Sequence, residues 1–124
     1  MSIGKEWKVE FDKDFKAEFD KFSKEVRLAI LQGARVLEGL GPNLGRPYVD
    51  TLNGSKHTNM KELRCDADDG VWRVAFAFDP ERKAVLLTAG DKSGVAKKRF
   101  YKSLIKKADA RFDAHLEKLK GEAK

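Results

Sequence analysis

Cysteine is nearly absent from this sequence: among its 124 residues only Cys65 carries a thiol. A single cysteine cannot form an internal disulfide, so we expect a reducing, cytoplasmic setting in which Cys65 is structural. Apolar residues never form a run approaching the roughly 20 that a membrane-spanning helix needs. Residues 1–15 mix charges of both signs and contain no apolar segment of the kind found in secretion signals. The sequence therefore predicts no association with a membrane.

Motifs that bind metals or cofactors are also missing. The chain has no cysteine pair with zinc-ligand spacing, no P-loop and no glycine-rich dinucleotide motif. A serine or cysteine triad needs a histidine base, and the sequence contains only His57 and His115. We place His57 in a loop that we expect to be exposed, and we interpret His115, beside an apolar helical stripe, as a packed residue. No metal and no cofactor is predicted.

Positive charge is what the sequence does have, and it is concentrated near the C-terminus. The whole chain carries a net charge of +6, and residues 92–120 contain ten basic residues against three acidic ones. Clustered charge sets the local potential and therefore selects local partners. The charge pattern favours an anionic partner such as a nucleic acid.

Hydrophobic periodicity predicts a single α+β domain over residues 1–124 that ends in a frayed tail at about 121–124. Apolar and charged residues alternate over 7–11, which predicts a first strand. After it, apolar residues recur at three- and four-residue spacing over 15–40. This stripe predicts one long helix or a helical hairpin broken near 22–24, and both alternatives present the same apolar face.

A loop is expected from residue 41 to about 58, because Gly41 and Pro42 end the helix. Three strands then follow in a row and form an antiparallel meander, with the first strand of the chain at one edge. The chain ends in a basic amphipathic helix that begins near Ser93-Gly94. The expected architecture is a small antiparallel sheet packed against helices. The three predicted meander strands cover residues 60–65, 71–78 and 84–89.

Four cations fall on the predicted sheet or at its end, and strand alternation assigns their faces. Arg73 shares a face with Ala75 and Ala77, so we expect it to point away from the core. Lys61 lies on the opposite face of its strand from Arg64. Several cations on one small sheet are costly unless an anion meets them, although each could also be an ordinary solvated residue beside an aspartate. The four residues are Lys61, Arg64, Arg73 and Lys92.

Several short segments, taken in order, carry a resemblance to a known family. They are Met60-Lys61-Glu62-Leu63-Arg64, Trp72-Arg73, Phe78-Asp79-Pro80, Leu86-Leu87 before Gly90-Asp91-Lys92, and Phe100-Tyr101. In this order they resemble HigB-like toxins of the RelE/ParE toxin-antitoxin superfamily, in the branch described as phage-derived host-inhibition proteins. The resemblance implies a RelE-like fold, cleavage of messenger RNA on the ribosome, and neutralisation by a HigA-like helix-turn-helix antitoxin in a hetero-oligomer.

The resemblance also implies roles for individual residues. In RelE-like nucleases, cations at the places of Arg64, Arg73 and Lys92 surround the scissile phosphate, and a late tyrosine stands near the place of Tyr101. The reaction is a metal-free attack of the ribose 2'-hydroxyl on the adjacent phosphate. Arg73 and Lys92 would stabilise the developing charge, and Lys61 would help to activate the hydroxyl. Tyr101 either stacks on RNA or packs in the core. The expected RNA-binding residues are Lys56, His57, Lys98, Arg99, Tyr101, Lys102 and Lys106.

Two alternatives from other functional classes stay open. The same fold could belong to a ParE-like toxin that poisons DNA gyrase through protein contacts and cleaves no RNA. The cations could also serve a nontoxic nucleic-acid-binding module that contacts the backbone without chemistry. Retained toxicity after Arg73→Ala and Lys92→Ala would favour the gyrase alternative, whereas a neighbouring antitoxin gene would count against the binding module.

Overall fold

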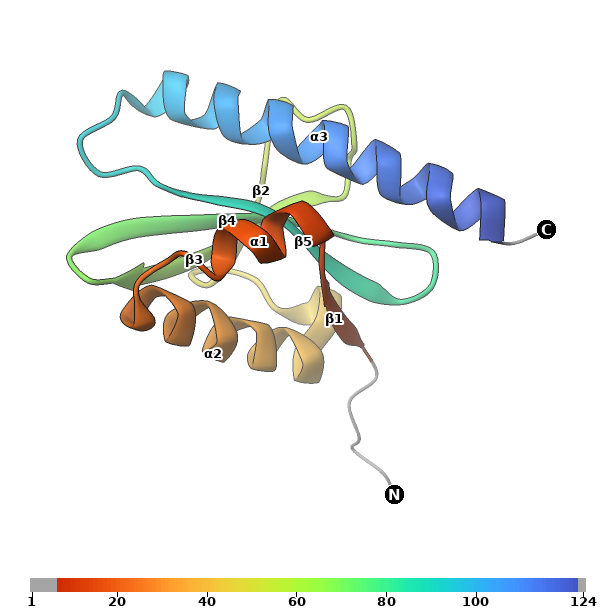
Figure 1. The fold of residues 1–124 in the computed structure, drawn as a ribbon, viewed down its shortest axis with the longest axis horizontal. Coiled ribbons are helices and arrows are strands. Elements are labelled where there is room, and N and C mark those ends of the chain that lie inside the picture. Colours follow the sequence, from red (N-terminus) through yellow and green to blue (C-terminus); the bar gives the residue numbers. More distant parts are fainter. Residues whose placement is uncertain (1–6, 123–124) are drawn as a thin grey trace.

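The computed structural model describes residues 7–122, which form one mixed sheet between two helical layers (Figure 1). This part of the chain contains three α-helices, a short 3₁₀ helix and five strands. In chain order the elements are β1 (Lys8–Phe11), α1 (Lys13–Phe19), α2 (Lys24–Leu40), η1 (Gly41–Asn43), β2 (Val49–Thr51), β3 (Met60–Ala67), β4 (Gly70–Phe78), β5 (Lys83–Asp91) and α3 (Lys97–Glu122).

Side-chain caps divide the first helical segment in two, which confirms the helical-hairpin alternative. Asp12 Oδ2 accepts hydrogen bonds from the backbone N–H groups of Asp14 and Phe15, both at 3.0 Å, and so starts α1. Ser23 Oγ accepts from the N–H of Val26 at 3.3 Å and starts α2. Each cap satisfies N–H groups that have no partner within the helix itself. The cap at Ser23 therefore starts a second helix, so the apolar stripe does not lie on one continuous helix.

The strands form one sheet in the order β1-β5-β4-β3-β2. The predicted meander of β3, β4 and β5 is confirmed, and β1 lies at the predicted edge, where it pairs in parallel with β5. The expectation of a loop from 41 to 58 is wrong at β2, which pairs antiparallel with β3 and places Val49 opposite Leu63. A strand of three residues is too short to show an alternating pattern, and its pairing with β3 defines it.

Helices cover both faces of this sheet (Figure 1). On one face α1 and α2 pack over a core that includes the fully buried Phe76. On the other face α3 packs over a second core that includes Phe112, Ala75 and Ala77. The expectation that Arg73 points away from the core is therefore wrong. The small side chains beside it let a helix approach the sheet closely, and they do not mark an open surface.

The terminal helix is basic and amphipathic as predicted, but its bounds differ from the prediction. It begins at Lys97, after a turn in which Gly94 has a φ of +76°, and not near Ser93-Gly94. Gly121 and Glu122 continue the helix, so the predicted fraying is wrong for these two residues. The rest of the predicted tail, 123–124, lies outside the described residues. Within 7–122 no helix is long and apolar enough to cross a membrane.

Gly41 is a position where only glycine fits, and this leads to a stability prediction. Its φ is +53°, and a Cβ added there would overlap the indole ring of Trp7. We expect Gly41→Ala to lower the free energy of unfolding by about 2 kcal/mol or more, because strain and a steric clash add. Gly39→Ala is the matched control: no atom lies within 4 Å of its added Cβ. In α2 it should stabilise by up to about 1 kcal/mol. Urea unfolding measures both.

Candidate anion-binding site

Strand pairing brings three of the predicted cations together on the sheet face that α3 covers. Arg64 of β3 stands opposite Arg73 of β4 in the sheet register. The backbone N–H of Lys92 donates to the carbonyl of Val71 at 2.9 Å, so the chain just after β5 continues this ladder. Lys92 Nζ lies 5.7 Å from the ring centroid of Tyr101 in α3. We call Arg64, Arg73 and Lys92 the cation cluster.

The members of the cation cluster act on one another electrostatically. Burial lowers the pKa of Lys92 below its usual value, and the charge of Arg73 lowers it further. Lys97 and Arg64 act in the same direction, whereas Glu62 opposes them. The like charges of the cluster therefore disfavour one another. An anion bound among these groups would relieve their repulsion.

A carboxylate that sequence reasoning missed lies at the centre of the cation cluster. The Glu62 side chain is only 5% exposed. Its Oε1 accepts a hydrogen bond from Tyr101 Oη at 2.7 Å, and its Oε2 accepts from Arg64 Nη2 at 3.2 Å. Burial and this hydrogen bond raise the pKa of Tyr101. Glu62 and Arg64 are two residues apart on one strand and therefore share a face, so their spacing was the available signal.

The Arg73 guanidinium is buried but incompletely bonded. Nη1 donates to the carbonyl of Trp72 at 2.9 Å and to Asp66 Oδ1 at 3.3 Å. Nε lies 3.8 Å from Glu62 Oε1, within ion-pair distance but beyond a hydrogen bond. Among the described residues this Nε has no hydrogen-bond partner, although it is buried. A buried donor without an acceptor costs about 1 to 3 kcal/mol, and an oxygen of a bound anion could supply the acceptor.

Lys61 does not join the cation cluster. It precedes Glu62 on β3, so it points to the opposite face of the sheet, which is the face of Leu63. Leu63 is 1% exposed and belongs to the core beneath α2. The sequence-based face assignment of Lys61 is confirmed. Its predicted role beside the phosphate has no support from this geometry.

The loop before β3 is fastened to α3, which places Lys56 and His57 away from the cation cluster. His57 Nε2 lies 2.8 Å from Asp113 Oδ1, and its ring contacts Phe112 edge-on at 4.9 Å between centroids. Lys56 forms an ion pair with the same Asp113. The expected exposure of His57 is wrong, since its side chain is only 17% exposed. Both residues hold the loop against α3 through Asp113. Their contact with RNA stays a prediction.

His115 is a packed residue, as predicted. Its side chain is 8% exposed, and Nε2 lies 2.8 Å from Asp79 Oδ2. Asp79 Oδ1 also accepts the backbone N–H groups of Glu81 and Lys83, both at 2.9 Å. The pair therefore fastens α3 to the turn between β4 and β5.

The solvent face of α3 carries the remaining predicted RNA-binding residues. All four basic side chains are exposed, and none contributes to the core. They are Lys98, Arg99, Lys102 and Lys106. Tyr101 differs from them because its ring packs against the core beneath α3 while its hydroxyl reaches Glu62. The core alternative for Tyr101 is therefore confirmed, and stacking on RNA stays a prediction. Lys97 and Asp66 are two further neighbours of the cluster that sequence reasoning missed.

Cys65 is buried on the opposite sheet face, which gives a prediction about its reactivity. The residue is 5% exposed, and burial raises the pKa of its thiol to about 12. Because the thiolate is the reacting form, we expect no alkylation of the native protein by iodoacetamide at a pH near the ordinary thiol pKa of about 8.5. Full alkylation should follow unfolding in urea. Intact-mass spectrometry distinguishes the two states, and rapid native alkylation would contradict the buried placement.

The structure also bears on metal binding. Within residues 7–122 no group of three or more histidine, cysteine, aspartate or glutamate side chains is placed to hold a metal ion. The cluster itself contains three cations beside a tyrosine hydroxyl and one buried carboxylate.

The fold is that of RelE-like toxins. The structure of the E. coli toxin RelE, solved in the free state as a double arginine-to-alanine mutant, matches with a TM-score of 0.55 at 14% sequence identity. The match covers 80% of this chain and 93% of RelE. The predicted α+β class, with a sheet packed against helices and a C-terminal helix, is confirmed.

Sequence comparison identifies the family. Residues 17–113 match the family described as Phage derived protein Gp49-like (DUF891), and the chain belongs to it. Two Mycobacterium tuberculosis proteins named as toxins are similar to it. HigB2 is 45% identical over 94 residues, covering 75% of this chain, and the chain spans only 46% of HigB2. HigB3 is 45% identical over 89 residues, covering 72% of this chain and 75% of HigB3. The chain is therefore HigB-like in sequence, and its fold is similar to that of RelE.

Proposed function

We propose that this protein is the toxin of a type II toxin-antitoxin system and that it cleaves messenger RNA on the ribosome. The similarity to proteins named as HigB toxins and the RelE-like fold support the class. The cognate antitoxin would be a HigA-like helix-turn-helix protein that forms a hetero-oligomer with the toxin. Ribosomes and messenger RNA would be the other partners, and the cytoplasm the site of action.

One observation carries the nuclease proposal: the buried Arg73 Nε, which has no acceptor among the described residues, lies beside Arg64 and Lys92. Arginine presents several N–H groups in a fixed plane and suits the oxygens of a phosphate. A phosphodiester at this place would satisfy the free N–H group and reduce the repulsion within the cluster. The exposed basic side chains of α3 would add sequence-independent contacts to RNA backbone, which weaken as salt rises.

In the proposed reaction the ribose 2'-oxygen attacks the adjacent phosphorus, and the 5'-oxygen leaves and takes up a proton from water, giving a 2',3'-cyclic phosphate and a 5'-hydroxyl. Negative charge grows on the phosphate oxygens in the transition state, where Arg73 and Lys92 would stabilise it. The 2'-hydroxyl proton needs an acceptor, and Glu62 is the buried carboxylate that borders the cations. We do not assign this step to Lys61, because it faces the other side of the sheet.

The direct test is to add the purified protein to ribosomes programmed with a defined messenger and to map the new 5' ends. Cleavage that requires ribosomes would support the proposal. An intact messenger together with toxicity in cells would refute it and favour the gyrase-poisoning alternative, which supercoiling assays would then test. An intact messenger without toxicity would leave the nucleic-acid-binding module.

A further inference from the structure

An exposed aromatic ring lies in the turn that leads into β2. Tyr48 is 59% exposed, and within residues 7–122 it is the only aromatic residue in the exposed class. Its backbone is nevertheless held at both ends. The N–H of Tyr48 donates to the carbonyl of Gly45 at 3.1 Å, and the carbonyl of Tyr48 accepts from the N–H of Arg64 at 2.8 Å. The ring is therefore presented to solvent from a backbone that is anchored to β3.

The hydrogen bond from Arg64 extends the pairing of β2 with β3 by one residue. The register places Val49 opposite Leu63, so the next pair along the ladder is Tyr48 and Arg64. Residues directly opposite each other in antiparallel strands share a face of the sheet. Val49 and Leu63 are both buried in the core beneath α2. Because successive residues of a strand face opposite sides, Tyr48 and Arg64 face the side of the cation cluster.

Tyr48 ends a row of residues that crosses the sheet. Next to it stands Arg64, and Arg64 stands opposite Arg73 in the register of β3 and β4. The backbone of Tyr48 is therefore two strand spacings, about 10 Å, from the backbone of Arg73. A nucleotide whose phosphate lies at Arg73 extends its base over a comparable distance. The Tyr48 ring thus lies within reach of a base next to that phosphate.

Asp50 joins the same turn to the cation cluster. Its Oδ2 lies 3.3 Å from Arg46 Nε and 3.3 Å from Arg64 Nη2, so one carboxylate oxygen is shared by two guanidinium groups. The side chain of Arg46 is 79% exposed, which leaves it accessible to a ligand. The turn therefore places an exposed ring and an exposed cation together at the edge of the cation cluster.

We propose that Tyr48 and Arg46 form a subsite for the messenger nucleotide next to the scissile phosphate, in which Tyr48 stacks on the base and Arg46 contacts the backbone. Proteins bind single-stranded RNA by stacking its bases on aromatic side chains, and arginine suits its phosphates. The ring of Tyr101 packs against the core beneath α3, so Tyr48 supplies the exposed ring beside the cluster. Stacking accepts every base, so the subsite would hold the messenger without reading its sequence. This inference rests on the proposed function for the identity of its ligand.

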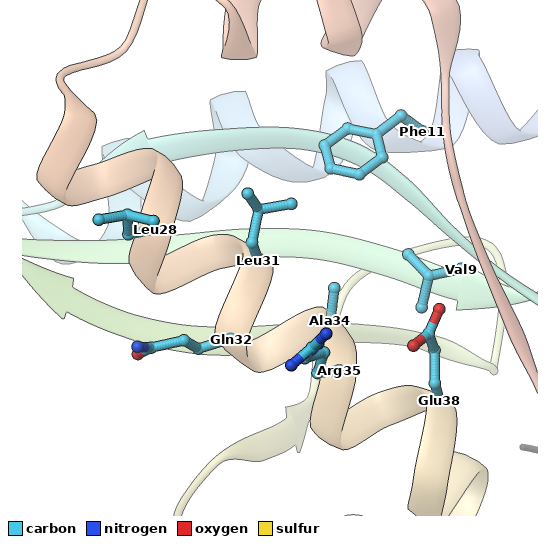
Figure 2. A pocket seen from close by; sticks show the side chains of 8 residues that line it. All are labelled: Val9, Phe11, Leu28, Leu31, Gln32, Ala34, Arg35 and Glu38. Atoms are coloured by element: carbon cyan, nitrogen blue, oxygen red, sulfur yellow. The ribbon is translucent and has the colours of Figure 1, made fainter.

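Cleavage on programmed ribosomes tests the ring. Tyr48→Ala should lower kcat/KM by about 5- to 150-fold, the range for loss of one stack between a base and an aromatic side chain. Tyr48→Phe keeps the ring and should stay within about twofold of the wild type. Leu31→Ala is the matched control and should also stay within about twofold, because Leu31 is 44% exposed in a groove between α2 and β1 on the other side of the sheet (Figure 2). Thermal unfolding checks the fold of each variant. A folded Tyr48→Ala protein that cleaves like the wild type would overturn the subsite.

A messenger that lacks one base shows what Tyr48 contacts. Each nucleotide beside the mapped scissile phosphate is replaced in turn by an abasic one. At the position in the subsite, the wild type should slow by about the factor that Tyr48→Ala causes, and Tyr48→Ala should slow by no more than about twofold further, because the two changes remove the same contact. If every abasic messenger slows both proteins by the same factor, Tyr48 contacts ribosomal RNA or protein, and the inference is overturned.

A measurement without ribosomes separates this inference from the proposed function. The base analogue 2-aminopurine, placed in a short single-stranded RNA, should lose fluorescence on binding to the wild type and keep it with Tyr48→Ala. In the same titration Arg46→Ala should reduce the slope of log affinity against log salt by about 0.7, the value for one phosphate contact to a single strand. An unchanged slope would remove Arg46 from the subsite. Quenching without cleavage would overturn the nuclease and keep the subsite, whereas the absence of both in the wild type would overturn both.

Discussion

Replacing Arg73 by alanine is expected to slow ribosome-dependent cleavage by about 100- to 1000-fold, the effect of removing one preorganised donor from a transition state. The side chain is buried, and its Nε lacks an acceptor among the described residues. Hydrogen bonds from Nη1 to the carbonyl of Trp72 and to Asp66 hold the guanidinium in place. The rate at which new 5' ends appear on programmed ribosomes measures the loss. Arg73→Lys should be intermediate, because it keeps the charge and loses the planar set of donors.

Lys61→Ala is the matched control for Arg73→Ala. Both substitutions remove one positive charge from the same pair of strands, but Lys61 faces the α2 side of the sheet and Arg73 faces the α3 side. A general effect of net charge on ribosome binding would reduce both rates alike. Thermal unfolding of each variant shows whether the fold persists. If the Arg73→Ala protein is folded and cleaves as fast as the wild type, Arg73 is not part of the catalytic site.

The parts of the fold that could be predicted from sequence are those whose signals are local. Ser23 predicted the break between α1 and α2, because a capping side chain bonds an N–H group only three residues away. The meander followed from short connections between apolar strands. β2 could not be found in this way, because three residues become a strand only through pairing with β3, where Val49 meets Leu63. Pairing between distant segments leaves little trace in either segment alone.

Three cations of the candidate site could be predicted from the sequence, but their surroundings could not. Period-two alternation placed Arg73 with Ala75 and Ala77 correctly, yet that face proved to be covered by α3. Alanines beside a cation fit an open surface and a closely packed helix equally well, so the sequence could not decide between them. Glu62 was overlooked for a related reason. Its place in the site is defined by hydrogen bonds from Tyr101 and Arg64, and Tyr101 is distant in the sequence.

Glu62→Gln is expected to lower the free energy of unfolding by about 3 kcal/mol, as removal of one partner from a buried ionic group does. Glutamine keeps the shape of the side chain and an acceptor for Tyr101, but it removes the charge that balances Arg64 and Arg73. The cations of the cluster then repel one another without compensation. Sulfate should restore stability to this variant more than to the wild type, because it supplies the missing negative charge. Urea unfolding with sulfate, and with chloride at equal ionic strength, measures both effects.

Glu117→Gln provides the reference for removing a carboxylate at the surface. Glu117 is 76% exposed and its ion pair with Lys120 spans 3.6 Å, so the change should be within about 1 kcal/mol and insensitive to sulfate. Two effects are expected for Glu62→Gln. The free energy of unfolding falls, and its increase on adding sulfate is larger than in the wild type. A side chain that only packs the core would show the first effect without the second. If Glu62→Gln unfolds like the wild type and ignores sulfate, the cluster is not an anion site in which Glu62 supplies the balancing charge.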